Sequence, residues 1–157
     1  MTTRSTLTNA ELITKFYQSF ADKNVEGMIA CYHDEIQFED PAFGKLMGED
    51  AKKMWRVLMK RSKGEIEITF SNVVANEKTG SANWEAKYVF SQTKRKVVNV
   101  ISAQFEFKDG KIFRHKDHFD LWKWSRQALG WKGYLLGWSS FMKKKMQQQS
   151  RKLLGAD

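Results

Sequence analysis

Polar side chains on apolar strand faces are typical of sites that transfer protons, and this chain contains a small group of them. Side chains of a β-strand alternate between its two faces, so residues two apart share a face. By this parity, four polar residues lie among aliphatic and aromatic neighbours: Asp40, Asn99, His115 and Asp117. A buried polar group costs free energy unless it is paired or lines a pocket. We therefore predict an acid/base site inside the fold, with Asp40, His115 and Asp117 as catalytic residues.

Each of these positions also has a purely structural explanation. Asp40 precedes Pro41 and can cap the following turn through an Asx-type hydrogen bond. His115 and Asp117 can pair with each other at a strand end, and Asn99 can satisfy buried backbone groups. The sequence alone leaves both explanations open.

We predict neither a metal site nor a cofactor. His118 and Asp120 extend the cluster of His115 and Asp117 along the same strand. Alternation leaves only two of these four residues on each face, whereas a metal site needs three or four converging ligands. A β-bulge after Asp117 would turn His118 and Asp120 inward in place of the other two. The chain has no glycine-rich phosphate loop and no nucleophile elbow.

The elements that must position these residues follow from hydrophobic periodicity and capping signals. A capping box at Thr8 and Glu11 starts a helix that runs to about Ala21. Further helices are expected over about residues 25–32, 49–62 and 140–154, and strands over 36–40, 66–74, 82–90, 97–107 and 111 to about 124. Asp109-Gly110 is a strong hairpin signal. This order predicts an α+β fold with three helices on a curved antiparallel sheet, plus a C-terminal helix.

Length and composition favour one soluble unit. The 157 residues, 18.4 kDa in mass, are expected to form a single domain over residues 1–157. The single cysteine, Cys31, excludes an intramolecular disulfide and a cysteine zinc site. The N-terminus lacks the apolar segment of a signal peptide, and no run approaches the roughly 20 apolar residues that cross a bilayer. We therefore expect a cytoplasmic protein.

The net charge of +9 is unevenly distributed, because residues 1–40 carry three basic and seven acidic side chains. Strong basicity can indicate a nucleic-acid, membrane or acidic partner, or simply a well-hydrated surface. No nucleic-acid-binding motif is present. We expect the hydrated surface, with neither nucleic acid nor membrane as partner.

The C-terminal third of the chain offers apolar surface of undecided use. Residues 121–141 contain four of the six tryptophans and could form core packing, a lid over a pocket or a dimer interface. The basic helix over about 140–154 is expected to be solvated rather than a membrane anchor. Val98 and Val100, on the outward face of strand 97–107, predict a homodimer that buries this face.

Two runs of residues carry a family resemblance. YHDEIQFEDPAFGKLMG (32–48) and FKDGKIFRHKDHFDLW (107–122) resemble the nuclear transport factor 2-like superfamily, and within it the SnoaL-like branch that includes ketosteroid isomerase and limonene epoxide hydrolase. The resemblance implies a cone-shaped fold with a deep apolar pocket, commonly in a homodimer. The residues predicted to bind a ligand in that pocket are Phe16, Tyr32, Phe43, Trp55, Trp84, Tyr88, Asn99 and Phe119.

This sequence contains only part of the catalytic residues that the resemblance implies. In ketosteroid isomerase the base is the aspartate of a Glu-Asp-Pro motif, which corresponds to Asp40. The positions of its two oxyanion donors fall on Phe16 and Ala103, which cannot donate a hydrogen bond. Losing even one such donor costs about 10²–10³ in rate, so standard ketosteroid isomerisation is not expected. Asp117 resembles the position of an acid/base aspartate in the cyclases and the epoxide hydrolase.

These observations support a leading hypothesis and two alternatives. The first is a protein that binds a small apolar or aromatic molecule, with isomerase-, cyclase- or hydrolase-type acid/base chemistry in the pocket. The second is a non-catalytic ligand carrier or partner-binding module on the same scaffold. The third is a basic protein that acts on nucleic acid or membrane through its C-terminal helix.

Overall fold

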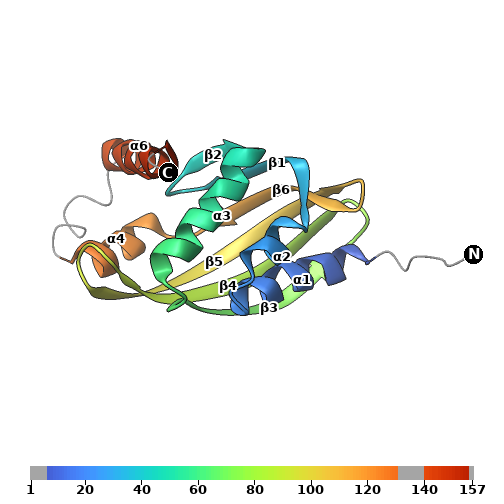
Figure 1. Cartoon of the computed structure of the whole chain (residues 1–157), viewed down its shortest axis with the longest axis horizontal. Helices are drawn as coiled ribbons and strands as arrows, with labels where there is room; N and C mark the ends of the chain where they lie inside the picture. Colours follow the sequence, from blue (N-terminus) through green and yellow to red (C-terminus); the bar gives the residue numbers. More distant parts are fainter. Residues whose placement is uncertain (1–6, 131–139, 156–157) are drawn as a thin grey trace, which may run out of the picture.

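A computed structural model describes residues 7–130 and 140–155 and confirms the α+β class (Figure 1). The helices are α1 (Asn9–Ala21), α2 (Val25–Ile29), α3 (Glu49–Ser62), α4 (Leu121–Leu129) and α6 (Ser140–Gly155). The strands are β1 (Tyr32–Asp40), β2 (Gly44–Met47), β3 (Glu67–Ala75), β4 (Thr79–Phe90), β5 (Arg95–Lys108) and β6 (Lys111–His118). Within the described residues, no helix is long and apolar enough to cross a membrane. Trp131 and Trp138 lie outside the described residues.

The strands form one sheet in the order β2-β1-β6-β5-β4-β3. Only β1 and β6 pair in parallel, whereas the other neighbours are antiparallel. Helices α1, α2 and α3 lie across one face of this curved sheet, as expected, and α6 lies near β2 (Figure 1). The parallel pair matters for the site, because it sets two strands with inward carboxyl groups beside each other.

Local sequence signals account for several boundaries. The Thr8 hydroxyl accepts from the Glu11 amide, and the Glu11 carboxylate accepts from the Thr8 amide, which confirms the capping box. Asp109 and Gly110 both have positive φ, as the two central residues of a type I′ turn require. This turn joins β5 to β6 and so fixes their register.

Other boundaries differ from the sequence-based expectation. The second helix ends at Ile29 instead of Tyr32, and Tyr32 starts a longer β1 that pairs with an unexpected β2. The last strand ends at His118 because Asp120 caps α4 by accepting from the Lys123 amide. Trp122 and Trp124 therefore lie in a helix, and the prediction of a strand through Trp124 was wrong.

The β-bulge considered after Asp117 does not occur there. The register of β5 with β6 shifts between Glu106 and Phe107 instead. Asp117 stays buried, whereas His118 is exposed. His115 and Asp117 are therefore the pair that points inward.

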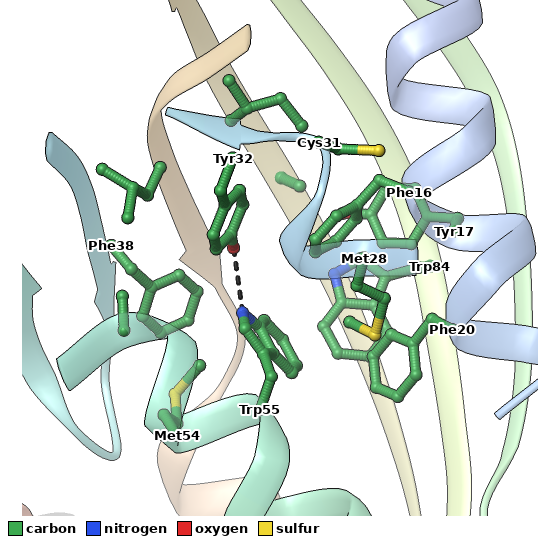
Figure 2. Packing of buried hydrophobic residues seen from close by; sticks show 14 of the residues in the cluster. Phe16, Tyr17, Phe20, Met28, Cys31, Tyr32, Phe38, Met54, Trp55 and Trp84 are labelled. Carbon is green, nitrogen blue, oxygen red and sulfur yellow. Dashed lines mark hydrogen bonds between the residues drawn. The ribbon is translucent and has the colours of Figure 1, made fainter. Parts of the chain in front are cut away.

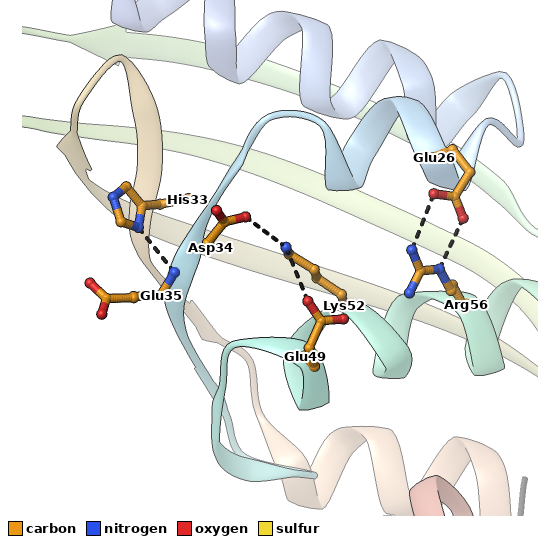
Figure 3. A network of polar contacts seen from close by, with 7 residues as sticks. All are labelled: Glu26, His33, Asp34, Glu35, Glu49, Lys52 and Arg56. Carbon is orange, nitrogen blue, oxygen red and sulfur yellow. Dashed lines mark hydrogen bonds and ion pairs between the residues drawn. The ribbon is translucent and has the colours of Figure 1, made fainter.

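Polar side-chain contacts join helix α3 to α2 and to β1 (Figure 3). The Arg56 guanidinium donates to both carboxylate oxygens of Glu26 on α2, at 2.9 and 3.2 Å. Lys52 lies 3.3 Å from Asp34 of β1 and 3.4 Å from Glu49. The Arg56–Glu26 pair is exposed and contributes about 0–1 kcal/mol, whereas the Lys52 side chain is buried and only its carboxylate partners are exposed. These contacts mainly fix how α3 lies on the sheet.

Candidate active site

The centre of the fold holds a chain of hydrogen bonds between five buried side chains. The Trp55 Nε1–H donates to the Tyr32 hydroxyl at 2.9 Å, a contact drawn in Figure 2. The Tyr32 hydroxyl lies 2.7 Å from His115 Nδ1, and His115 Nε2 lies 2.9 Å from Asp117 Oδ1. The Trp84 Nε1–H donates to the same Asp117 oxygen at 3.3 Å. We call this set of five residues the buried relay.

Counting protons along the buried relay assigns the tautomer of His115. The Tyr32 hydroxyl already accepts from Trp55, so its single proton is donated to His115 Nδ1. The imidazole proton then resides on Nε2 and is donated to Asp117. In this arrangement a neutral imidazole gives every N–H and O–H of the relay an acceptor. Asp117 Oδ1 receives two N–H donors, the arrangement that suits a carboxylate.

The buried relay is closed off from solvent by aromatic rings. The side chain of His115 is 0% exposed and that of Asp117 is 2% exposed. Around the imidazole, ring centroids lie 4.6–6.2 Å away, and these rings belong to Phe16, Tyr32, Phe38, Trp55 and Phe105. Because both nitrogens of His115 are engaged, the imidazole is placed to orient Asp117 rather than to meet a ligand.

Asp40 lies beside the buried relay. β1 and β6 pair in parallel with Phe38 opposite His115 and Glu39 opposite Lys116, so the next step of this register sets Asp40 beside Asp117. The Asp40 carboxylate also accepts from the Ala42 amide at 2.9 Å and the Phe43 amide at 2.6 Å. These hydrogen bonds confirm that Asp40 caps the turn, and the register also leaves its carboxyl group beside Asp117.

The surroundings of Asp40 favour its protonated form near neutral pH. Burial raises the pKa of Asp40 to about 7, and the charge of Asp117 adds to the rise. The two turn amides act in the opposite direction, Phe43 more strongly than Ala42.

A second polar group lies near Asp40 at the half-buried part of the site. The Trp124 Nε1–H donates to the Tyr88 hydroxyl at 2.6 Å, and Phe90 packs edge-on against Trp124. Burial raises the pKa of Tyr88, the Trp124 hydrogen bond opposes the rise, and the Asp40 charge adds to it. Trp124 was not predicted as a site residue. The helix start at Asp120 is the sequence signal that could have revealed it.

The structure divides the predicted ligand-binding residues into two groups. Five are buried. Tyr32, Trp55 and Trp84 belong to the buried relay, Phe16 packs against the imidazole of His115, and Phe43 lies in the turn after Asp40. Three are half-buried: Tyr88, Asn99 and Phe119. Asn99 lies on the inner face of β5, and its side-chain amide has no hydrogen-bond partner within the described residues. No set of three metal-ligating side chains occurs in residues 7–130 and 140–155.

The family model of the SnoaL-like domain matches residues 13–115. This is more than half of the chain, and the protein belongs to the SnoaL-like family of the nuclear transport factor 2-like superfamily. A search of curated proteins gave no match. The matched segment ends at His115, so α4 and α6 lie beyond it.

Solved structures show the same fold at low sequence identity. A protein from Pseudomonas putida KT2440 assigned as a polyketide cyclase is 18% identical, with a TM-score of 0.62, and the alignment covers 78% of this chain and 98% of that one. An LEH-like epoxide hydrolase from M. tuberculosis is 17% identical with a TM-score of 0.58, covering 85% and 93%. Bal32a, from a soil-derived mobile gene cassette, is 16% identical with a TM-score of 0.64, covering 76% and 95%.

The relay predicts unequal effects for two buried tyrosines. Tyr32→Phe removes the hydroxyl that serves both Trp55 and His115, leaving two buried groups unpaired. We expect this change to lower the free energy of unfolding by about 1–3 kcal/mol. Tyr17→Phe is the matched control, because the buried Tyr17 hydroxyl has no hydrogen-bond partner among the described residues. It should be neutral or stabilising. Urea unfolding at pH 7 measures both, and equal effects would contradict the relay.

Proposed function

We propose that the protein binds a small, uncharged, apolar molecule beside Asp40 and performs cofactor-independent acid/base chemistry on it. The observation that carries this proposal is the pairing of two carboxyl groups in unlike surroundings. Asp117 accepts two N–H donors from within the core, whereas burial raises the pKa of Asp40 to about 7. Paired groups whose protonation differs at one pH are what general acid/base catalysis uses.

Each residue has a distinct role in this proposal. Asp40 exchanges the proton with the bound molecule, and Asp117 supplies a fixed negative charge beside it. His115 is a positioning residue that orients Asp117. Tyr88 and Asn99 offer hydrogen bonds to an oxygen of the ligand, because the Tyr88 hydroxyl accepts from Trp124 and retains its own proton.

The class of ligand follows from charge and from the neighbours. Two carboxyl groups disfavour an anionic ligand, and the aromatic surroundings favour a ring-containing one. Structural neighbours assigned as a polyketide cyclase and as an epoxide hydrolase support acid/base chemistry on such molecules. The alternative is a non-catalytic carrier, and the complete enclosure of His115 favours it.

Binding of a neutral aromatic probe should depend on pH through Asp40. N-phenyl-1-naphthylamine is expected to bind tightly below about pH 7, where Asp40 is protonated, and several-fold more weakly above, because ligand entry desolvates the ionised carboxylate. Fluorescence titration between pH 5.5 and 8.5 measures this change. Asp40→Asn should abolish it, whereas the control Glu39→Gln should retain it. Affinity that is independent of pH in the unchanged protein would contradict the proposed site.

A second experiment distinguishes an enzyme from a non-catalytic carrier. It follows by NMR the exchange of the α-protons of 2-tetralone with deuterium, without added cofactor. The unchanged protein should accelerate exchange, and Asp40→Asn should lose about 10² or more of the acceleration. Binding of the fluorescent probe without any exchange would support the carrier function instead.

We also propose that two copies pair through the outer face of the sheet. Val98 is 38% exposed and Val100 is 57% exposed, on the face of β5 opposite the site. On the neighbouring strand β4, Lys87 lies opposite Val98 and Glu85 lies opposite Val100, so charged side chains flank this apolar surface.

Light scattering at tens of micromolar should give the mass of a dimer, and Val100→Lys should give the mass of a monomer because dimerisation would have to desolvate the lysine ammonium. Met47→Lys is the control, since Met47 is 61% exposed on β2 at the far edge of the sheet. A monomeric unchanged protein would overturn this proposal.

A further inference from the structure

The C-terminal helix contacts the turn that follows Asp40. Gln147 and Arg151 are four residues apart on α6 and so face the same side of it. Gln147 Nε2 donates to the Pro41 carbonyl at 3.1 Å. The Arg151 guanidinium donates from Nε to the Phe43 carbonyl and from Nη2 to the Lys45 carbonyl, each at 3.0 Å. Two carbonyls of the turn and one of the following strand, β2, are thus held by two side chains of a distant helix.

The same turn is bound to Asp40 through its amide groups. The Ala42 and Phe43 amides donate to the Asp40 carboxylate, at 2.9 and 2.6 Å. The Pro41–Ala42 peptide is therefore held from both sides, since its N–H donates to Asp40 and its C=O accepts from Gln147. The Ala42–Phe43 peptide, whose N–H also donates to Asp40, is followed directly by the Phe43–Gly44 peptide, whose C=O accepts from Arg151.

We propose that Arg151, assisted by Gln147, is a positioning residue that fixes the Asp40 carboxyl group beside Asp117. This inference rests on the proposed role of Asp40, and it assigns to α6 a function in the site. α6 lies beyond the matched 13–115 segment.

Packing around the contact shows that α6 approaches closely. Gly44 has φ +74, and a Cβ at this position would lie 2.9 Å from Arg151 Nη2 and 3.2 Å from Gln147 Oε1. Leu154, one turn further along α6, is 7% exposed and belongs to the hydrophobic core. Leu154 packs α6 against the core, and Arg151 contributes hydrogen bonds that hold the backbone after Asp40 in place.

The titration of Asp40 reports on this positioning. Burial, Asp117 of β6 and Glu39 of its own strand raise the pKa of Asp40, and the two turn amides lower it. The Asp40 charge in turn raises the pKa of Tyr88 on β4 and of Tyr32 on β1. The Phe43 amide is the strongest influence that favours the ionised form. Removing Arg151 would free the carbonyl of the peptide that follows Phe43 and so loosen the turn that presents the Phe43 amide to Asp40. A weaker hydrogen bond from this amide disfavours the carboxylate and raises the pKa of Asp40.

The test is a carboxyl-carbon NMR titration of Asp40 in the ligand-free full chain. Arg151→Met should raise the pKa of Asp40 by about 0.5 or more, and Arg151→Lys should recover part of the difference. Lys152→Met is the matched control, since it removes the same charge from the adjacent, exposed residue and should leave Asp40 unchanged. Gln147→Met should give a smaller rise in the same direction, and it serves where Arg151→Met does not fold.

An Asp40 titration that is unchanged or shifted downward in Arg151→Met, with or without a loss of stability, would overturn the inference. The experiment needs neither ligand nor turnover. Failure of the proposed acid/base function would leave this shift in place, and failure of the positioning role would leave the pH-dependent binding of the fluorescent probe in place.

Discussion

The structure depends on the need to pair every polar group that is buried with His115 and Asp117. An imidazole and a carboxyl group in an aromatic core cost several kcal/mol unless each donor has an acceptor. The relay meets this need by drawing one side chain from each of three elements: Tyr32 at the start of β1, Trp55 on α3 and Trp84 on β4. The same hydrogen bonds therefore join the helical layer to the sheet and leave one neutral tautomer for His115.

The pairing also produces two carboxyl groups with different properties. Asp117 accepts its hydrogen bonds from side chains of the core, whereas Asp40 accepts its hydrogen bonds from the backbone of a turn. Burial raises the pKa of Asp40 to about 7. Parallel pairing of β1 with β6 brings the two groups together, because it sets equivalent inward positions side by side. The candidate site therefore lies where β1 and β6 pair in parallel within an otherwise antiparallel sheet.

Strand parity was sufficient to predict the inward residues of the site. Asp40, His115 and Asp117 each follow a clear period-2 pattern. The segments around them, residues 32–48 and 107–122, carried the resemblance to the family whose fold the structure has. Parity could not show that Tyr32 and Trp55 are partners of His115, because the direction of a buried hydroxyl or indole N–H has no periodic signal.

Other features escaped prediction for different physical reasons. Trp122 and Trp124 are two residues apart with Lys123 between them, a spacing that also fits a strand, and the capping carboxylate of Asp120 starts a helix there instead. The contact of Arg151 with the turn is made to backbone carbonyls, which any sequence carries. It depends on how α6 docks and not on the residue types of the turn.

The central claim is that Asp40 holds a proton near neutral pH because it is buried beside Asp117. Its most direct test is the carboxyl-carbon titration of Asp40 in the unchanged protein and in Asp117→Asn. We expect a pKa of about 7 in the first and a clearly lower value in the second, because the neighbouring charge is removed. A pKa near the ordinary aspartate value in the unchanged protein, or the same value in both proteins, would contradict the account.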